Sequence, residues 1–173
     1  LSDRCIIMGG AGPPMMNMVY NSNYQIVQSR DYVMFLIEMI HDARIIPLDG
    51  REQADANVRQ WMGTSRGHWE GDTLVVDTVG FNEKTWLDFG GHMHSDQLHT
   101  IEYITRPDKN TLHYEATIDD PGAYTEPWTV AWDINWSEGQ ELADYICQEN
   151  NKYMIDLTDD FGNPFFETTA VAR

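Results

Sequence analysis

The sequence has no long apolar run and few basic residues. None of its apolar segments approaches the roughly 18 residues that a transmembrane helix needs, so we expect a chain that does not span a membrane. Only 11 basic residues stand against 28 acidic ones, which gives a formal net charge of −17 at pH 7. A surface this acidic repels phosphate groups. We therefore expect neither nucleic acid nor anionic lipid as a partner.

The sequence also lacks the signature motifs of covalent and nucleotide chemistry. It contains no G-x-S-x-G, no P-loop and no H-E-x-x-H, and no G-x-G-x-x-G follows an expected strand. The glycine-rich stretch at residues 9–12 is followed at once by Pro13 and Pro14, so it opens no helix that would hold a phosphate. These absences argue against a covalent hydrolase and against a nucleotide-binding protein.

The chain has 173 residues, of which 42% are hydrophobic and 23% charged. These are values of an ordinary globular domain that buries a core without a metal or a disulfide. We predict a single domain over residues 1–173, with an irregular N-terminal arm at 1–23, a β domain at 24–148 and a C-terminal tail at 149–173. No cofactor is expected.

Short runs of β-branched and aromatic residues, separated by turn residues, indicate strands from Tyr24 onward. We expect strands at 24–29, 32–39, 43–48, 68–71, 73–80, 98–106, 111–118, 128–136 and 142–148. The clearest alternation lies at 128–136, where five apolar residues face one way: Trp128, Val130, Trp132, Ile134 and Trp136. Closing such a meander would remove its exposed edges. We predict an all-β fold, an antiparallel up-and-down β-barrel, with a β-sandwich as the alternative.

Two cysteines, Cys5 and Cys147, lie near opposite ends of the chain. Their spacing matches no metal or haem motif and favours one disulfide, with two buried thiols as the alternative. A disulfide indicates an oxidising compartment, so we expect a periplasmic or secreted protein. The sequence begins at Leu1, and we expect that its N-terminus was processed or trimmed.

Two long connections, 49–66 and 81–97, are candidates for functional loops. The first carries Trp61, whereas the second carries Trp86 and several acidic and histidine residues around Gly90-Gly91. A histidine held by a carboxylate exchanges protons near neutral pH. We predict acid–base residues in and after the second loop: Asp88, His92, His94, His99 and Glu102. Ligand contacts are expected from Trp86, Tyr124 and Trp61.

The same histidines offer an alternative interpretation as a zinc, copper or iron site. Its ligands would be His92 and His94 with either His99 or Glu102. If 98–106 is one strand, however, His99 and Glu102 face opposite sides and do not both bind one ion. The main interpretation therefore uses no metal.

A second polar cluster surrounds Glu38 and Arg44. Glu38 shares the alternation of Met34 and Leu36, which predicts a carboxylate among apolar neighbours. Pairing with Arg44 or Arg106 would keep that carboxylate charged. We interpret the cluster as a structural ion pair, with a ligand anchor as the alternative.

Several motifs in order resemble a group of exported bacterial proteins of unassigned function. They are W-E-G-D-T-L-V-V-D-T at 69–78, T-W-L-D at 85–88, G-H-x-H-S at 91–95, L-H-x-x-E at 98–102 and D-D-P-x-x-Y-T-x-P-W-T at 119–129. The resemblance covers roughly residues 45–151 and implies export, but no reaction. Gly67-x-Trp69, at the start of an expected strand, is similar to the G-x-W signature of the calycin (lipocalin-like) barrels, although about three expected strands precede it here.

Six tryptophans and eight tyrosines favour an interior that accepts a flat apolar or aromatic small molecule. The expected function is therefore binding of such a molecule in a Trp/Tyr-rich cavity. One alternative is a non-covalent acid–base lyase, isomerase or hydrolase, and another is an accessory or structural subunit of an exported assembly. The tail segment 164–171 would then offer an edge strand for contact with a second copy or an assembly.

Overall fold

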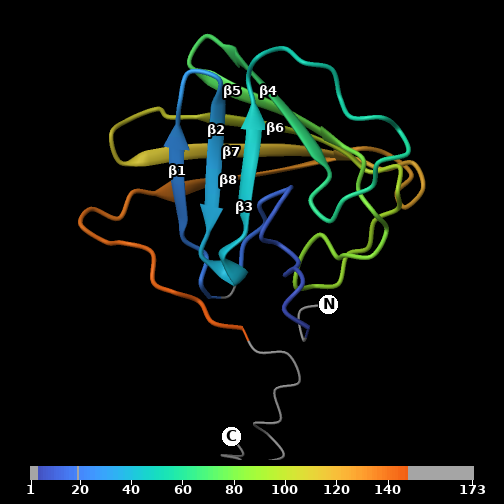
Figure 1. The fold of residues 1–173 in the computed structure, drawn as a ribbon, viewed down its shortest axis with the longest axis horizontal. Coiled ribbons are helices and arrows are strands. Elements are labelled where there is room, and N and C mark those ends of the chain that lie inside the picture. The colour runs from blue at the N-terminus through green and yellow to red at the C-terminus, as the bar shows by residue number, and fades with distance from the viewer. Residues whose placement is uncertain (1–3, 19, 148–173) are drawn as a thin grey trace, which may run out of the picture.

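Two antiparallel sheets form the protein in the computed structural model, which describes residues 4–18 and 20–147. The small sheet contains β1 (Tyr24–Gln28), β2 (Tyr32–Ile37) and β3 (Ala43–Pro47). The large sheet is a five-stranded meander of β4 (Thr64–Glu70), β5 (Thr73–Val79), β6 (His99–Thr105), β7 (Thr111–Asp119) and β8 (Trp128–Asn135). In Figure 1 the strands of the small sheet cross in front of those of the large one. The expected all-β fold is confirmed.

The closed barrel is not confirmed. Within the described part of the chain no hydrogen-bonded ladder joins the two sheets, and this arrangement fits the β-sandwich alternative. The sheets instead face each other across a shared core, as packed sheets do. No helix among the described residues is long and apolar enough to cross a membrane.

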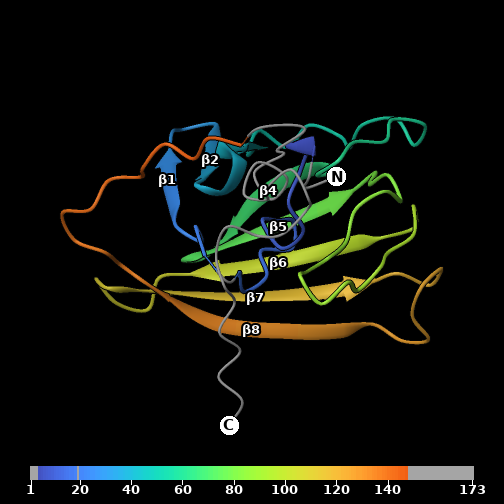
Figure 2. The same ribbon diagram turned by 90° about the horizontal axis from the view of Figure 1, so that it is seen from below.

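Eight of the expected strands are present, with shifted ends. β2 ends at Ile37 because the 3-10 turn η2 (Met39–His41) redirects the chain into β3, and β4 starts at Thr64, earlier than expected. The strand expected at 142–148 is wrong for residues 142–147, which form no strand, while residue 148 and the tail lie outside the described residues. The segment after β8 crosses from the edge of the large sheet toward the small sheet (Figure 2), so it does not run along a neighbouring strand.

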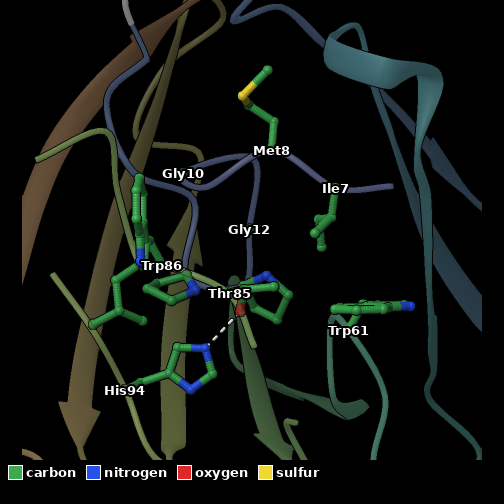
Figure 3. Close-up of a pocket in the computed structure, with 11 residues that line it drawn as sticks. Ile7, Met8, Gly10, Gly12, Trp61, Thr85, Trp86 and His94 are labelled. Atoms are coloured by element: carbon green, nitrogen blue, oxygen red, sulfur yellow. Dashed lines mark hydrogen bonds between the residues drawn. The ribbon is translucent and has the colours of Figure 1, made fainter. Parts of the chain in front are cut away.

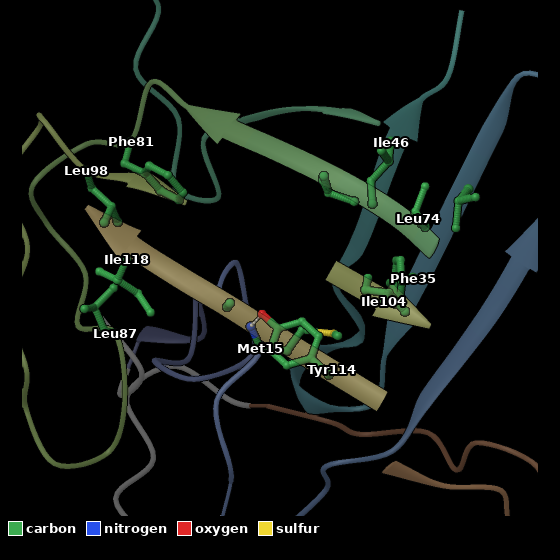
Figure 4. Close-up of a cluster of buried hydrophobic side chains, with 13 residues drawn as sticks. Met15, Phe35, Ile46, Leu74, Phe81, Leu87, Leu98, Ile104, Tyr114 and Ile118 are labelled. Atoms are coloured by element: carbon green, nitrogen blue, oxygen red, sulfur yellow. Dashed lines mark hydrogen bonds between the residues drawn. The ribbon is translucent and has the colours of Figure 1, made fainter. Parts of the chain in front are cut away.

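Alternating side chains of both sheets build the core between them (Figure 4). The small sheet contributes Val33, Phe35 and Ile46, and β5 and β7 contribute residues such as Val76 and Tyr114, all at most 2% exposed. On β8 the expected alternation is confirmed over the strand, because Trp128, Val130, Trp132 and Ile134 are half-buried against the core and the residues between them are exposed.

The N-terminal arm is irregular where described, as expected, but it is part of the core. Ala11 and Met15 are buried, and the backbone N–H of Met15 donates to the hydroxyl of Tyr114 at 2.8 Å. The expected disulfide joins Cys5 to Cys147, with 5.6 Å between their Cα atoms and 142 residues of separation. Closing so long a loop stabilises the fold by about 4–5 kcal/mol in the chain-entropy model. The disulfide thus ties the arm to the segment that follows β8.

Candidate functional site

The loop between β5 and β6 folds back on itself around Gly91. The N–H of Leu87 donates to the carbonyl of His92 at 2.8 Å, and Trp86 forms an isolated antiparallel bridge with Met93. Gly91 has a φ of +83°, a left-handed conformation that glycine adopts without strain. Leu87 is buried in the core, so one side of this turn is anchored while its tip reaches the surface.

Asp88 and His92 form a hydrogen-bonded pair at this turn. One carboxylate oxygen, Oδ2, lies 2.7 Å from His92 Nδ1, and the other accepts the His92 backbone N–H at 3.2 Å. Burial raises the pKa of Asp88, but the hydrogen bonds from His92 outweigh it and hold that pKa below its usual value. The His92 side chain is 61% exposed. Because Nδ1 is taken by Asp88, the ring is oriented with Nε2 available to a ligand.

His94 is buried and has partners on both ring nitrogens. Nδ1 donates to the carbonyl of Ser95 at 3.0 Å, because a carbonyl only accepts, and Nε2 lies 2.6 Å from the hydroxyl of Thr85 (Figure 3). Ser95 is held in turn by the buried carboxylate of Asp120, which accepts from its backbone N–H and its hydroxyl. His94 therefore fixes the base of the loop, and Thr85 is a partner that the sequence did not suggest.

Large apolar side chains are exposed around the Asp88–His92 pair. Trp86 is 58% exposed, Phe89 41% and Met93 62%. Trp61 is also exposed, but it lies on the other side of Thr85 from Trp86, with the N-terminal arm nearby (Figure 3). The cavity beside them is only about 20 Å³, enough for a water molecule. The loop thus offers an apolar surface rather than an enclosed pocket.

Tyr124 supports this loop from the turn between β7 and β8. Its hydroxyl donates to the carbonyl of Met93 at 2.7 Å, and its ring packs edge-on against Trp128 with 5.6 Å between centroids. Burial, followed by the negative charges of Asp120 and Asp88, raises the pKa of Tyr124. The phenol stays a neutral hydrogen-bond donor that holds the loop in place.

Glu102 lies away from the loop, in the core between the sheets. It pairs with Arg44 through both carboxylate oxygens, one of them 2.9 Å from Nη1. Arg44 also donates to the hydroxyls of Ser65 at 3.1 Å and Thr78 at 2.9 Å, and Tyr114 donates to Glu102 Oε1 at 2.8 Å. The pair is 4% and 0% exposed. These partners satisfy the buried charges, which indicates a structural role.

The expected pair of Glu38 with Arg44 is not formed. Glu38 does share the alternation of Met34 and Leu36, but that face is only half-buried, whereas Val33, Phe35 and Ile37 point into the core. Its carboxylate accepts instead from Asn23, at 2.7 Å from Nδ2. Arg44 is on the inward face of β3, opposite Phe35, and therefore reaches Glu102 across the core.

His99 lies on the outer face of the large sheet, and Glu102 on the inner face, as expected for one strand. The Nε2 atom of His99 is 2.8 Å from Oδ2 of Asp77, and Gln53 Nε2 donates to the other carboxylate oxygen of Asp77 at 2.8 Å. His92, His94 and His99 thus each have different hydrogen-bond partners. Among residues 4–18 and 20–147 no group of three or more His, Cys, Asp or Glu side chains is arranged to hold a metal ion.

The structure therefore brings only some of the predicted site residues together. Asp88, His92, His94 and Trp86 lie in one loop, with Tyr124 bonded to it. Arg44 and Glu102 meet in the core, and His99 joins Asp77 outside the sheet. Glu38 pairs with Asn23 instead, and Trp61 lies apart from Trp86. Comparison of the chain with family models, with curated proteins and with solved structures finds no match.

Proposed function

We propose that this protein binds a flat apolar or aromatic small molecule on the loop surface formed by Trp86, Phe89 and Met93. The observation that carries the proposal is the exposure of these three large side chains within a single turn. Contiguous exposed apolar surface is costly in water and marks an interaction site. A ligand that covers it gains the free energy of removing this surface from water.

The Asp88–His92 pair supplies the polar part of the proposed site. It lies in the same turn, and His92 Nε2 makes no hydrogen bond within the described residues. A ligand with one polar atom at its edge would bond this nitrogen while its apolar face lies on Trp86. The buried Leu87 and His94 hold the turn in shape before binding, which lowers the entropic cost of association.

An exported location belongs to the same proposal. A disulfide persists in oxidising compartments such as the periplasm or the extracellular space, and Cys5–Cys147 is such a bond. The resemblance to exported bacterial proteins supports the same location. We therefore expect a ligand that is present in the periplasm or outside the cell.

A neutral fluorescent probe tests the binding surface. N-phenyl-1-naphthylamine is aromatic and uncharged, and its emission rises when it leaves water, so titration into the protein reports apolar binding. We expect saturable enhancement, with affinity reduced about tenfold or more in Trp86→Ala, since a buried aromatic side chain contributes up to several kcal/mol. Trp69→Ala is the matched control, because Trp69 is also exposed but lies on β4. Equal losses in the two variants would contradict the proposal.

A second candidate function, proton transfer to the bound molecule, rests on the orientation of His92 by Asp88. An imidazole held at Nδ1 by a carboxylate is the arrangement of a general base. The probe is phenylacetone in D₂O, whose exchange of acidic C–H protons is followed by NMR. We expect exchange above the buffer rate, falling about 10²–10⁴-fold in His92→Ala.

His113→Ala is the control for this experiment. His113 has the same kind of partner, since its Nδ1 lies 2.7 Å from Asp133, but it lies on the outer face of β7. Exchange that is unchanged in His92→Ala, or lost equally in both variants, excludes the catalytic function and leaves the binding proposal intact.

A further inference from the structure

A groove of about 350 Å³ lies at the end of β5, and none of Trp86, Phe89 and Met93 lines it. Its apolar lining comes from Ala54, Ala56 and Val58 on one wall, with Val79 and Leu98 from the sheet end and the turn before β6. This volume and this mixture of apolar walls with a few polar groups are typical of small-molecule sites. None of the residues that line it is aromatic.

Gln53 lines this groove, and its amide is held by Asp77. Its Nε2 donates to Asp77 twice, to Oδ1 at 2.8 Å and to the backbone carbonyl at 3.2 Å, and these bonds fix the orientation of the amide. Its Oε1 is buried from solvent and has no hydrogen-bond partner in the described part of the chain, so it does not open into the groove. The polar groups that a ligand in the groove meets are therefore the exposed carboxylates of Asp55 and Asp96.

The charges around the groove are mainly negative. Asp55 and Asp96 line it, and Arg59 faces Asp96 at 3.8 Å, so one acid is partly neutralised. Asp77 accepts a hydrogen bond from Gln53 and also pairs with His99. This pair is next to the groove, because the β5–β6 register that joins Thr78 to Thr100 places the groove residue Val79 beside His99.

Two further charged groups approach the same edge. Asp119 is opposite His99 on β7, and adds negative charge. Arg66 is opposite Asp77 on β4, but its guanidinium donates to the carbonyls of Glu52 and Ser65, each at 2.8 Å. Acids therefore outnumber bases here, and a cationic donor is preferred to an anion.

We infer that the groove is a second ligand site, which takes a small primary amine with an apolar body. The ammonium group has three N–H donors and no acceptor. It would donate to the carboxylates of Asp55 and Asp96, while the carbon chain or ring packs on Val58, Val79 and Leu98. This site is independent of the proposed function, since the Trp86 surface contributes no residue to it.

Three probes with one body and different head groups test this inference. Cyclohexylmethylamine, cyclohexylmethanol and cyclohexanecarboxylate, whose bodies are neither flat nor aromatic, are titrated separately into the full chain by calorimetry at moderate salt. We expect the amine to bind at least tenfold more tightly than the other two, because charge-assisted hydrogen bonds are roughly twice as strong as neutral ones. Equal affinities, or a preference for the carboxylate, would overturn the inference.

Matched variants separate the groove from the general attraction of an acidic protein for cations. Asp96→Asn and Asp133→Asn change the net charge equally at two exposed positions, but only Asp96 lines the groove. We expect cyclohexylmethylamine affinity to fall several-fold in Asp96→Asn, which also releases Arg59, and to stay unchanged in Asp133→Asn. Equal losses would show attraction by net charge alone and reject the site.

Two more variants separate the groove from the Trp86 surface. Ala54→Phe should fill the groove and lower cyclohexylmethylamine affinity about tenfold or more, because the new side chain occupies the volume that the ligand needs. Trp86→Ala should leave this affinity unchanged. Retained binding in Ala54→Phe, or loss in Trp86→Ala, would place the amine elsewhere and overturn the inference, whatever the result for the aromatic probe.

Discussion

Arg44–Glu102 in the core and Asp88–His92 in the loop are two hydrogen-bonded pairs in contrasting surroundings. The first is almost fully buried and also bonded to Ser65, Thr78 and Tyr114. The second is in a turn with His92 largely in water. A buried charge without its partner is strongly destabilising, whereas an exposed pair contributes little to stability. The same chemistry is thus structural in one place and available to a ligand in the other.

The surroundings of the core pair keep its neighbours neutral. Burial first, and then the charge of Glu102, raise the pKa of both Tyr24 and Tyr114, with Arg44 acting in the opposite direction. The phenol of Tyr114 therefore remains a donor to Glu102 and an acceptor for Met15. Through this hydroxyl the core pair is joined to the N-terminal arm.

The largest effect is expected when the core pair is broken. Glu102→Gln leaves the guanidinium of Arg44 without its counter-charge in the core, and we expect the free energy of unfolding to fall by about 3–5 kcal/mol in urea titrations. The double variant Arg44→Met/Glu102→Leu removes both charges and should recover most of this loss. A loss below about 1 kcal/mol in Glu102→Gln would show that the two pairs are energetically alike.

A smaller effect is expected from the hydroxyl that links the core pair to the arm. Tyr114→Phe removes the bond to Glu102 and leaves the Met15 N–H unpaired, which should cost about 1.5–3 kcal/mol by the same measurement. Tyr103→Phe is the control, since Tyr103 is on the outer face of β6 and its hydroxyl makes no hydrogen bond within the described residues. If the free energy of unfolding falls equally in both variants, the hydrogen bonds of the Tyr114 hydroxyl do not stabilise the arm.

The smallest effect on stability is expected at the loop pair. Asp88→Asn should lower the unfolding free energy by less than about 1 kcal/mol, because His92 is mostly exposed and solvent screens the pair. The pKa of Asp88 is lowered in the folded state, so its stabilisation is present above the usual value of 3.8 and is lost as the pH falls through the lower folded value. The wild type and the variant should therefore converge in acid, as unfolding measured between pH 3 and pH 7 would show. A difference that grows in acid would contradict this.

Local patterns predicted most of the strands but not the shape that they build. Alternation over 128–136 shows which residues of β8 face the core, because side chains of a strand alternate by geometry. The same pattern gave no sign that residues 142–147 form no strand. That segment leads toward Cys147, whose bond to Cys5 lies at the arm, and a covalent constraint of this kind outweighs local β propensity.

The candidate site was predicted where its residues are close in sequence. Asp88 and His92 are four residues apart and meet in one turn, so their grouping was accessible from the chain. Arg44 and Glu102 are separated by 58 residues, and Asp77 and His99 by 22, with the β5–β6 loop between the last two. Strand register across such a loop depends on how the sheets pack, and the sequence carries no local signal for it.

The sequence by itself determined the all-β class, the acidic surface and the loop in which histidine, acid and aromatic residues gather. These properties follow from composition, from period-two alternation and from neighbours along the chain. Only the tertiary structure decided that Cys5 and Cys147 are bonded, that Glu102 belongs to the core, that His99 pairs with Asp77 outside the large sheet and that the sheets form two layers. These depend on which face of each strand is covered, because burial decides whether a charged side chain is a structural partner or a ligand contact.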